Sequence, residues 1–253
     1  MLLHGLTGSR RVFAGLETRL RAEPTRADTF SFDLPGFGTN KELDGSGDIA
    51  NYLLFISDSI ANRFPAGPLV LIGHSLGGVL ALAWASEHRE RVAQIVLLNA
   101  PLGESREDVI RSLLQERVGW GALLLRHRGL AHLACVLLRG THLIRLFRFA
   151  KPAYVPKAVF LDYTQHSWKS VAQMFDRVLL AVPGGRLVRQ IVDIPILNLT
   201  GEADDEIFRR SIAYRNVRNV TLPGGHLMLL EHPDSIGEVI VGFIIRDRNG
   251  PGG

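Results

Sequence analysis

The sequence predicts an α/β protein with a mostly parallel central sheet, helices on both faces of the sheet and an inserted helical cap. Short apolar runs rich in β-branched residues alternate with segments of helical period, a pattern typical of buried strands joined by helices. Residues 101–192 interrupt this alternation, because they contain helical patterns and no strand pattern. We therefore assign residues 1–100 and 193–248 to the core and residues 101–192 to a cap over the candidate site.

The first half of the core begins with a short strand at residues 1–4. A helix is expected over 10–21, because its apolar residues recur at helical spacing. Alternating polar and apolar residues predict a strand over 29–34, and a second helical pattern follows over 47–64.

The most informative segment is Gly73–Gly78, which reads Gly-His-Ser-Leu-Gly-Gly. It follows an apolar run at 68–72, which predicts a buried strand, and precedes a run at 79–85, which predicts a buried helix. A strand, a G-x-S-x-G turn and a helix form a nucleophile elbow, in which the serine takes strained backbone angles. Ser75 is therefore the candidate nucleophile, and the helix N-terminus beneath it favours negative charge.

The core continues with a strand at 95–99 and resumes after the cap with a strand at 195–201. A short strand is expected at 219–222 and a closing helix near 234–246. Within the cap, apolar spacing predicts an amphipathic helix that includes Val109 to Val118 and a later helix from Trp168 to Leu179. Between these two helices, glycines separate further helical segments near 122–125, 130–138 and 142–149.

A serine hydroxyl needs a base and an orienting acid, which in this arrangement follow it in the order acid, histidine. Asp204 and Asp205 follow the 195–201 strand at its carboxyl end, where α/β sheets carry their chemistry. His226 lies on a glycine-rich loop after the next strand. We predict Asp204 and His226 as the acid and base, and Asp205 as a solvated carboxylate or a helix N-cap.

An oxyanion hole needs two backbone N–H groups aimed at the developing negative oxygen. One is expected from Leu76, directly after the nucleophile, and the other from the loop after an early strand. Leu6 is the candidate in that loop. His4 is expected to be structural, bonding the loop backbone, because His226 already supplies the base.

These segments together resemble the α/β-hydrolase superfamily, of the serine esterase, lipase and non-haem perhydrolase type. The serine at the elbow departs from the aspartate nucleophile of the epoxide hydrolase and haloalkane dehalogenase branches. The interval from Asp204 to His226 is shorter than is usual in the superfamily, which implies a trimmed helix. The matching segments are His4–Ser9, Asp33–Gly38, Gly73–Gly78, Gly201–Asp204, and Gly225–His226 with Glu231 and Pro233.

The resemblance implies a carboxylesterase-like or lipase-like serine hydrolase that cleaves an ester of a small to medium apolar substrate through an acyl-enzyme on Ser75. No metal or organic cofactor is implied. One alternative is a cofactor-free lyase of the menaquinone-pathway type, with the same triad. A second is a ligand receptor on a hydrolase scaffold. Perhydrolase chemistry also stays open, since fold does not fix function.

Composition favours one enzyme domain: 253 residues with 46% hydrophobic content can bury one large core. The net charge is +4, but the sequence shows no basic helix, no aromatic stacking platform and no zinc-ligand spacing. A nucleic-acid partner is therefore not indicated. The single Cys135 excludes an internal disulfide and suits a cytoplasmic protein. No apolar run approaches the ~20 residues that span a bilayer, and no signal peptide is recognised.

The cap contains a basic segment, residues 117–151, with seven Lys and Arg and no Asp or Glu. Our first interpretation is a solvated surface. An anionic substrate and an interfacial lid that contacts a membrane surface are the less favoured alternatives.

The first strand is short, and the superfamily carries a two-stranded hairpin before this point, which the sequence lacks. We expect that the native chain starts upstream, or that a homo-oligomer covers the edge of the 29–34 strand.

Overall fold

The computed structural model describes residues 1–22, 25, 27–40, 48–115, 120–140, 152–164 and 166–248. Its centre is a five-stranded parallel sheet in the order β1-β2-β3-β4-β5. This sheet, with helices on both faces, confirms the predicted fold class. The strands are β1 (Leu2–Leu3), β2 (Leu69–His74), β3 (Val92–Leu98), β4 (Ile196–Gly201) and β5 (Val217–Leu222).

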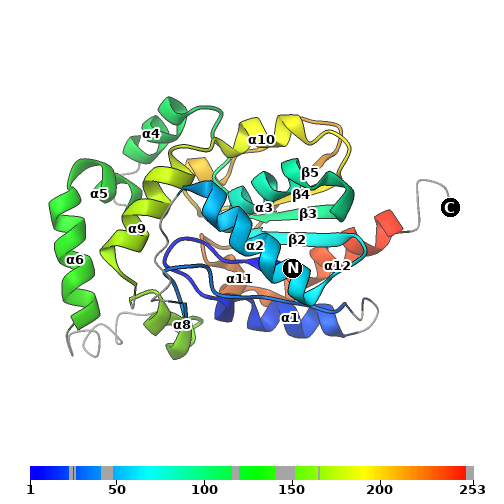
Figure 1. Ribbon diagram of the computed structural model, residues 1–253, viewed down its shortest axis with the longest axis horizontal. Helices are drawn as coiled ribbons and strands as arrows, with labels where there is room; N and C mark the ends of the chain where they lie inside the picture. Colours follow the sequence, from blue (N-terminus) through cyan, green and yellow to red (C-terminus); the bar gives the residue numbers. More distant parts are fainter. Residues whose placement is uncertain are drawn as a thin grey trace.

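Helices connect and cover the strands (Figure 1). In the core they are η1 (Arg10–Phe13), α1 (Ala14–Arg21), α2 (Ile49–Arg63), α3 (Leu76–Glu87), η2 (Arg89–Arg91), η4 (Glu206–Phe208), α11 (Met228–Glu231) and α12 (Pro233–Arg248). Between β3 and β4 they are α4 (Arg106–Gln115), α5 (Trp120–Arg126), α6 (Arg128–Gly140), α8 (Lys157–Asp162), α9 (Trp168–Met174), the π-helical turn η3 (Phe175–Leu179) and α10 (Gly184–Gln190).

Two hydrophobic clusters cover the two faces of the sheet. Alternate residues point to opposite faces of a strand, so Leu71 and Ile72 of β2 belong to different clusters. One cluster includes α2, α3 and α10, and the other includes α1 and α12. In Figure 1, α3 and α10 accordingly lie on one side of the strands and α1 and α12 on the other.

The predicted strand at 29–34 is wrong as a full strand. Ser31 forms an isolated parallel bridge with Leu2, and the Leu2 N–H donates to the Phe30 carbonyl at 2.9 Å. The segment runs beside β1, but β1 has two residues, so a longer hydrogen-bonded ladder has no partner. Phe30 and Phe32 instead pack against each other, with ring centroids 5.4 Å apart.

Several boundaries differ from the expectations. Strand β3 begins at Val92, before the predicted 95, and β5 begins at Val217, before 219. Gly129 lies inside α6 instead of ending a helix. The predicted helix over 142–149 and the end of the one at Val118 lie outside the described residues.

Residues 101–192, which we call the insert, extend from the core at the end where α4, α5, α6 and α9 lie (Figure 1). The insert contacts the loops that follow β1 and β4, since α8 packs on η1 and α4 packs on η4. Helix α10, at the end of the insert, packs on α3 of the core. The insert therefore meets the carboxyl ends of the strands, where the candidate site residues lie.

Candidate active site

The backbone at Ser75 is strained. Ser75 joins β2 to α3 with φ 53° and ψ −127°, a conformation that side-chain-bearing residues rarely adopt. Such strain costs about 1–3 kcal/mol and persists where the surrounding structure enforces it. A Cβ added to Gly77 would lie 2.1 Å from the Leu3 carbonyl oxygen, and one on Gly73 would lie 2.4 Å from the Gly77 carbonyl oxygen. A side chain at position 73 or 77 would therefore collide with the backbone, which is why both positions are glycine.

Asp204 and His226 meet as a hydrogen-bonded pair. His226 Nδ1 lies 2.8 Å from Asp204 Oδ2, and the Asp204 side chain is 3% exposed. The Asp205 backbone N–H donates to Asp204 Oδ1 at 2.8 Å. The Asp205 side chain is not part of the pair: it occupies the N-cap position of η4 without a capping bond. Burial, followed by the negative charge of Asp204, raises the pKa of Asp205.

Asn99 is a site residue that the sequence did not single out. It follows β3, is fully buried, and donates from Nδ2 to Asp204 Oδ2 at 2.5 Å. Its φ of 49° is in the left-handed region, which asparagine tolerates better than most residues. Its Oδ1 is buried with no hydrogen-bond partner among the described residues. The position of Asn99 at the carboxyl end of a buried strand could have indicated a site residue. Its contact with Asp204 could not be predicted, because the two residues are far apart in the sequence.

His226 is held from two further sides. The ring of Phe208 lies 4.3 Å from the His226 ring, centroid to centroid. His74 donates from Nε2 to the His226 carbonyl at 2.8 Å. Burial, followed by the nearby His226, lowers the pKa of His74 to about 3, so His74 is a neutral donor at neutral pH. Among the described residues Ser75 Oγ has no hydrogen bond, so the structure joins acid to base but not base to nucleophile.

The candidate oxyanion donors flank Ser75. Leu76 is the first residue of α3, so its N–H has no acceptor within the helix. On the other side the loop after β1 touches the serine: a Cβ added to Gly5 would lie 2.7 Å from Ser75 Cβ and 3.2 Å from Ser75 Oγ. Leu6 comes directly after this point of contact.

His4 has the structural geometry that we expected. Its Nδ1 donates to the Gly5 carbonyl at 2.8 Å, and its Nε2 accepts the Leu34 N–H at 2.9 Å. Burial lowers the pKa of His4, in keeping with a neutral ring that donates at one nitrogen and accepts at the other.

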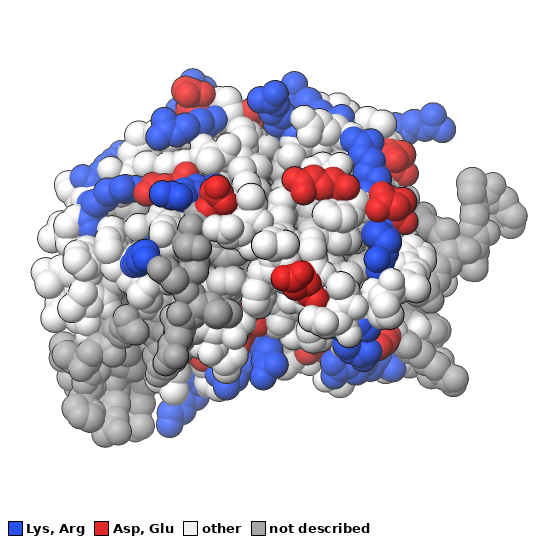
Figure 2. Space-filling view, viewed as in Figure 1, with Lys and Arg blue, Asp and Glu red and all other residues white. Residues whose placement is uncertain are grey.

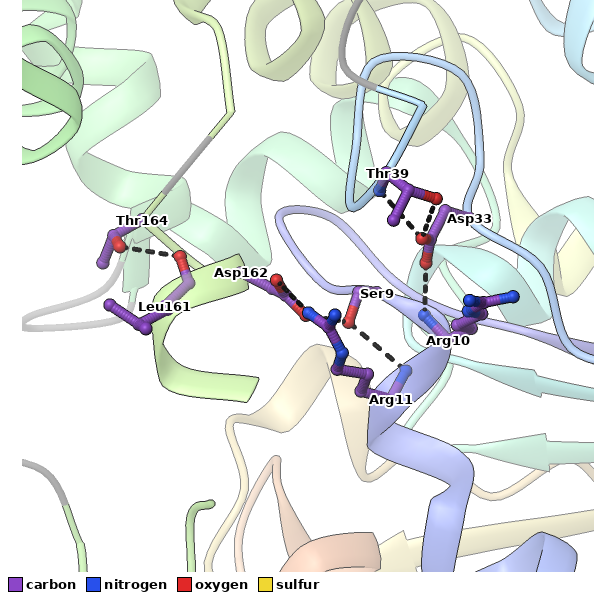
Figure 3. A network of polar contacts seen from close by, with 8 residues as sticks. All are labelled: Ser9, Arg10, Arg11, Asp33, Thr39, Leu161, Asp162 and Thr164. Atoms are coloured by element: carbon purple, nitrogen blue, oxygen red, sulfur yellow. Dashed lines mark hydrogen bonds and ion pairs between the residues drawn. The ribbon is translucent and has the colours of Figure 1, made fainter. Parts of the chain in front are cut away.

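A polar network ties the loop after β1 to the insert (Figure 3). Ser9 Oγ donates to Asp162 Oδ2 at 2.5 Å, and Arg11 Nη1 reaches both Asp162 oxygens at 2.8 and 2.9 Å. The neighbouring Arg10 N–H donates to Asp33 Oδ1 at 2.7 Å. Ser9 and Asp162 are both buried, although 153 positions separate them. The insert therefore anchors the loop that carries Leu6, and sequence spacing gave no sign of this.

A strained serine above a helix N-terminus, a buried aspartate hydrogen-bonded to a histidine and a parallel sheet are together the hallmarks of the α/β hydrolases. The chain matches the model of the alpha/beta hydrolase family over residues 1–239, and it belongs to that family of enzymes. Within the described residues, no three His, Cys, Asp or Glu side chains are grouped as a metal site would need.

Curated relatives match over part of the chain. A putative 2-succinyl-6-hydroxy-2,4-cyclohexadiene-1-carboxylate synthase of Haemophilus influenzae is 28% identical over 47% of this chain and 48% of its own. A pimeloyl-[acyl-carrier protein] methyl ester esterase of Chromobacterium violaceum is 33% identical over 39% of this chain and 35% of its own. The matches therefore span less than half the length of these relatives.

Among solved structures, a membrane phospholipase A described as a bacterial virulence factor superposes with a TM-score of 0.70. The match covers 98% of this chain and 79% of that one at 19% identity, which shows a shared fold.

Proposed function

We propose that this protein is a serine hydrolase that cleaves a carboxylic ester of a small to medium apolar substrate. One observation carries the proposal: the strained Ser75 lies at the carboxyl edge of the sheet, and the buried Asp204 is hydrogen-bonded to His226 at the same edge. The esterase relative supports ester chemistry, since it is 33% identical over 98 residues.

In the first half of the reaction, Ser75 Oγ attacks the acyl carbonyl carbon and His226 Nε2 accepts the hydroxyl proton. Asp204 accepts the His226 Nδ1–H and so holds the tautomer whose Nε2 is free to take a proton. Ser75 and His226 form no hydrogen bond in the structure, and hydrogen bonds of this kind often tighten only when substrate is bound. The alcohol then leaves with the proton from His226.

In the second half, His226 takes a proton from water, and the resulting hydroxide attacks the acyl carbon. The bond between the acyl carbon and Ser75 Oγ then breaks, Ser75 Oγ takes the proton back from His226, and the acid is released. The N–H groups of Leu6 and Leu76 stabilise the oxyanion of both tetrahedral intermediates, a contribution of about 3–4 kcal/mol per donor in comparable sites. Leu6, Leu76 and Phe208 belong to the hydrophobic cluster on this side of the sheet, and Phe208 lies against the His226 ring. Apolar side chains beside the site favour an apolar acyl or alcohol group.

The experiment is covalent labelling. A fluorophosphonate probe is expected to modify Ser75, and Ser75→Ala is expected to abolish both labelling and the hydrolysis of a chain-length panel of chromogenic esters. Loss of the nucleophile leaves only residual catalysis, at least ~10³ below the parent. Labelling at another residue, or no labelling of folded protein, would reject the triad.

A cofactor-free lyase is the second candidate function, and the synthase relative, 28% identical over 125 residues, is the observation that favours it. A lyase would use His226 to remove a proton from an acidic substrate and would show negligible ester turnover. Tight ligand binding without either activity would indicate a receptor.

A further inference from the structure

Helix α6 turns large apolar residues toward solvent and small residues toward the rest of the protein. A surface helix normally turns its large apolar residues toward the core. Among the α6 side chains that the structure describes, the buried ones are the small residues Ala131 and Cys135, at 0% and 3% exposure. The large apolar side chains described there are exposed: Leu130 by 57%, Leu133 by 53%, Val136 by 53% and Leu137 by 45%.

The exposed residues share one face. At ~100° per residue, the four lie within an arc of about 120°, roughly opposite to Ala131 and Cys135. Of the seven large apolar residues that are exposed in the described part of the chain, these four are on α6 and the others are Leu54, Tyr154 and Val192. The exposure is therefore concentrated on one helix, and such a patch marks an interaction surface.

The stretch of sequence that contains this face is basic. Residues 117–151 carry seven cations and no acidic residue. Arg126 and Arg128, where α5 ends and α6 begins, are exposed; Arg126 bonds the Leu114 carbonyl and Arg128 pairs with Asp176. In Figure 2, drawn from the same side as Figure 1, the described part of the left margin, where α6 lies, is largely uncharged, and both blue and red side chains lie beside it.

The charge of this segment distinguishes between two possible partners for the exposed face, a second copy of the chain and a lipid surface. A second copy of this chain would bring the same cations against each other, and like charges facing one another are unfavourable. An anionic lipid surface takes both features together, because it buries the leucines at the acyl boundary and attracts the arginines. No described helix is long and apolar enough to cross a bilayer, so α6 would lie along the surface. Its 13 residues have a length of roughly 20 Å.

We propose that the exposed face of α6 docks this protein on an anionic membrane surface. Our first interpretation of the basic segment is a solvated surface, and the exposed leucine face of α6 is the observation that leads us to propose the membrane-surface alternative instead. The proposal does not depend on the ester chemistry, because it concerns binding.

The test is sedimentation with phosphatidylglycerol vesicles and, in parallel, with phosphatidylcholine vesicles. The parent protein is expected to bind phosphatidylglycerol at low salt and to release as salt rises. The triple variant Leu130→Ser, Leu133→Ser and Val136→Ser is expected to bind about tenfold more weakly or worse. The matched control Leu54→Ser with Val192→Ser, at positions 62% and 66% exposed, is expected to bind like the parent.

A second variant tests how much the positive charges contribute to vesicle binding and leaves the apolar face of α6 unchanged. Arg126→Gln with Arg128→Gln is expected to weaken binding to phosphatidylglycerol and to leave binding to phosphatidylcholine unchanged. All variants are checked by thermal melting and by light scattering. The proposal is overturned by no vesicle binding, by equal binding to both lipids, by equal loss in the matched control, or by a dimer that the triple variant dissociates.

Discussion

The hydrogen bonds around Asp204 predict an unusual result for Asp204→Asn. All three partners of the carboxylate are donors: His226 Nδ1 and Asn99 Nδ2 at Oδ2, and the Asp205 N–H at Oδ1. An asparagine therefore cannot replace the aspartate without a change nearby. If its nitrogen faces the Asp205 N–H, that buried contact joins two donors, which costs about 1–3 kcal/mol.

The opposite orientation of the new amide can satisfy every group around it. The amide nitrogen would donate to His226 Nδ1, once the ring moves its proton to Nε2, and to Asn99 Oδ1, once the Asn99 amide turns over. Turning the Asn99 amide over costs little free energy, because Asn99 Oδ1 has no partner among the described residues. After the turn, Asn99 Nδ2 is the unpaired atom instead of Oδ1. The Asp205 N–H still finds an oxygen. The protein stays folded, but Nε2 now carries a proton and cannot accept one from Ser75.

We therefore expect Asp204→Asn to lower kcat by ~10⁴ through the wrong tautomer. We expect it to lower the free energy of unfolding by only about 1 kcal/mol, the difference between a charged and a neutral acceptor. For a domain of this length that corresponds to a fall in Tm of about 2–4 °C.

The assay is steady-state hydrolysis of a chromogenic ester together with thermal melting of the same sample. Asp205→Asn is the matched control, since the Asp205 side chain is exposed and only its backbone N–H enters the site. It is expected to change kcat by less than about threefold. The reasoning fails if folded Asp204→Asn stays within tenfold of the parent, or if Asp205→Asn is equally damaging.

Three further results are expected. Asn99→Gly keeps the positive φ and removes the amide that donates to Asp204, so kcat is expected to fall by roughly tenfold in a protein that stays folded, as measured by ester hydrolysis and thermal melting. An unchanged kcat would show that the amide does not position the acid. Asp162→Asn weakens the contacts that anchor the loop after β1, so kcat is expected to fall with KM little changed. The free energy of unfolding is expected to drop by about 1–3 kcal/mol. A change in Tm without a change in kcat would show that Asp162 contributes to stability and not to catalysis. Hydrogen bonding to Arg210 holds the pKa of Asp108 at about 2, below its unfolded value of 3.8, so this pair stabilises the fold above pH 4 and loses that effect as pH falls toward 2. Asp108→Asn is expected to cost about 1 kcal/mol at pH 7 and less as the pH falls, as measured by urea unfolding; a difference that is constant from pH 7 to pH 2 would contradict this.

The sequence by itself determined the fold class, because buried parallel strands and amphipathic helices have different apolar periods. It also placed Ser75, Asp204 and His226 at loops that follow strands, since a parallel sheet brings the carboxyl ends of its strands to one edge. The structure brings Asp204 and His226 together there, while the catalytic roles of all three stay predictions.

Only the tertiary structure decided the supporting contacts. Asn99 bonds Asp204 across 105 positions and Ser9 bonds Asp162 across 153. No local pattern encodes such pairs, because each depends on where separate elements pack. The same holds for α6: its sequence is apolar on several sides, and only packing against α5 and α9 determined which side was buried and which was left to water.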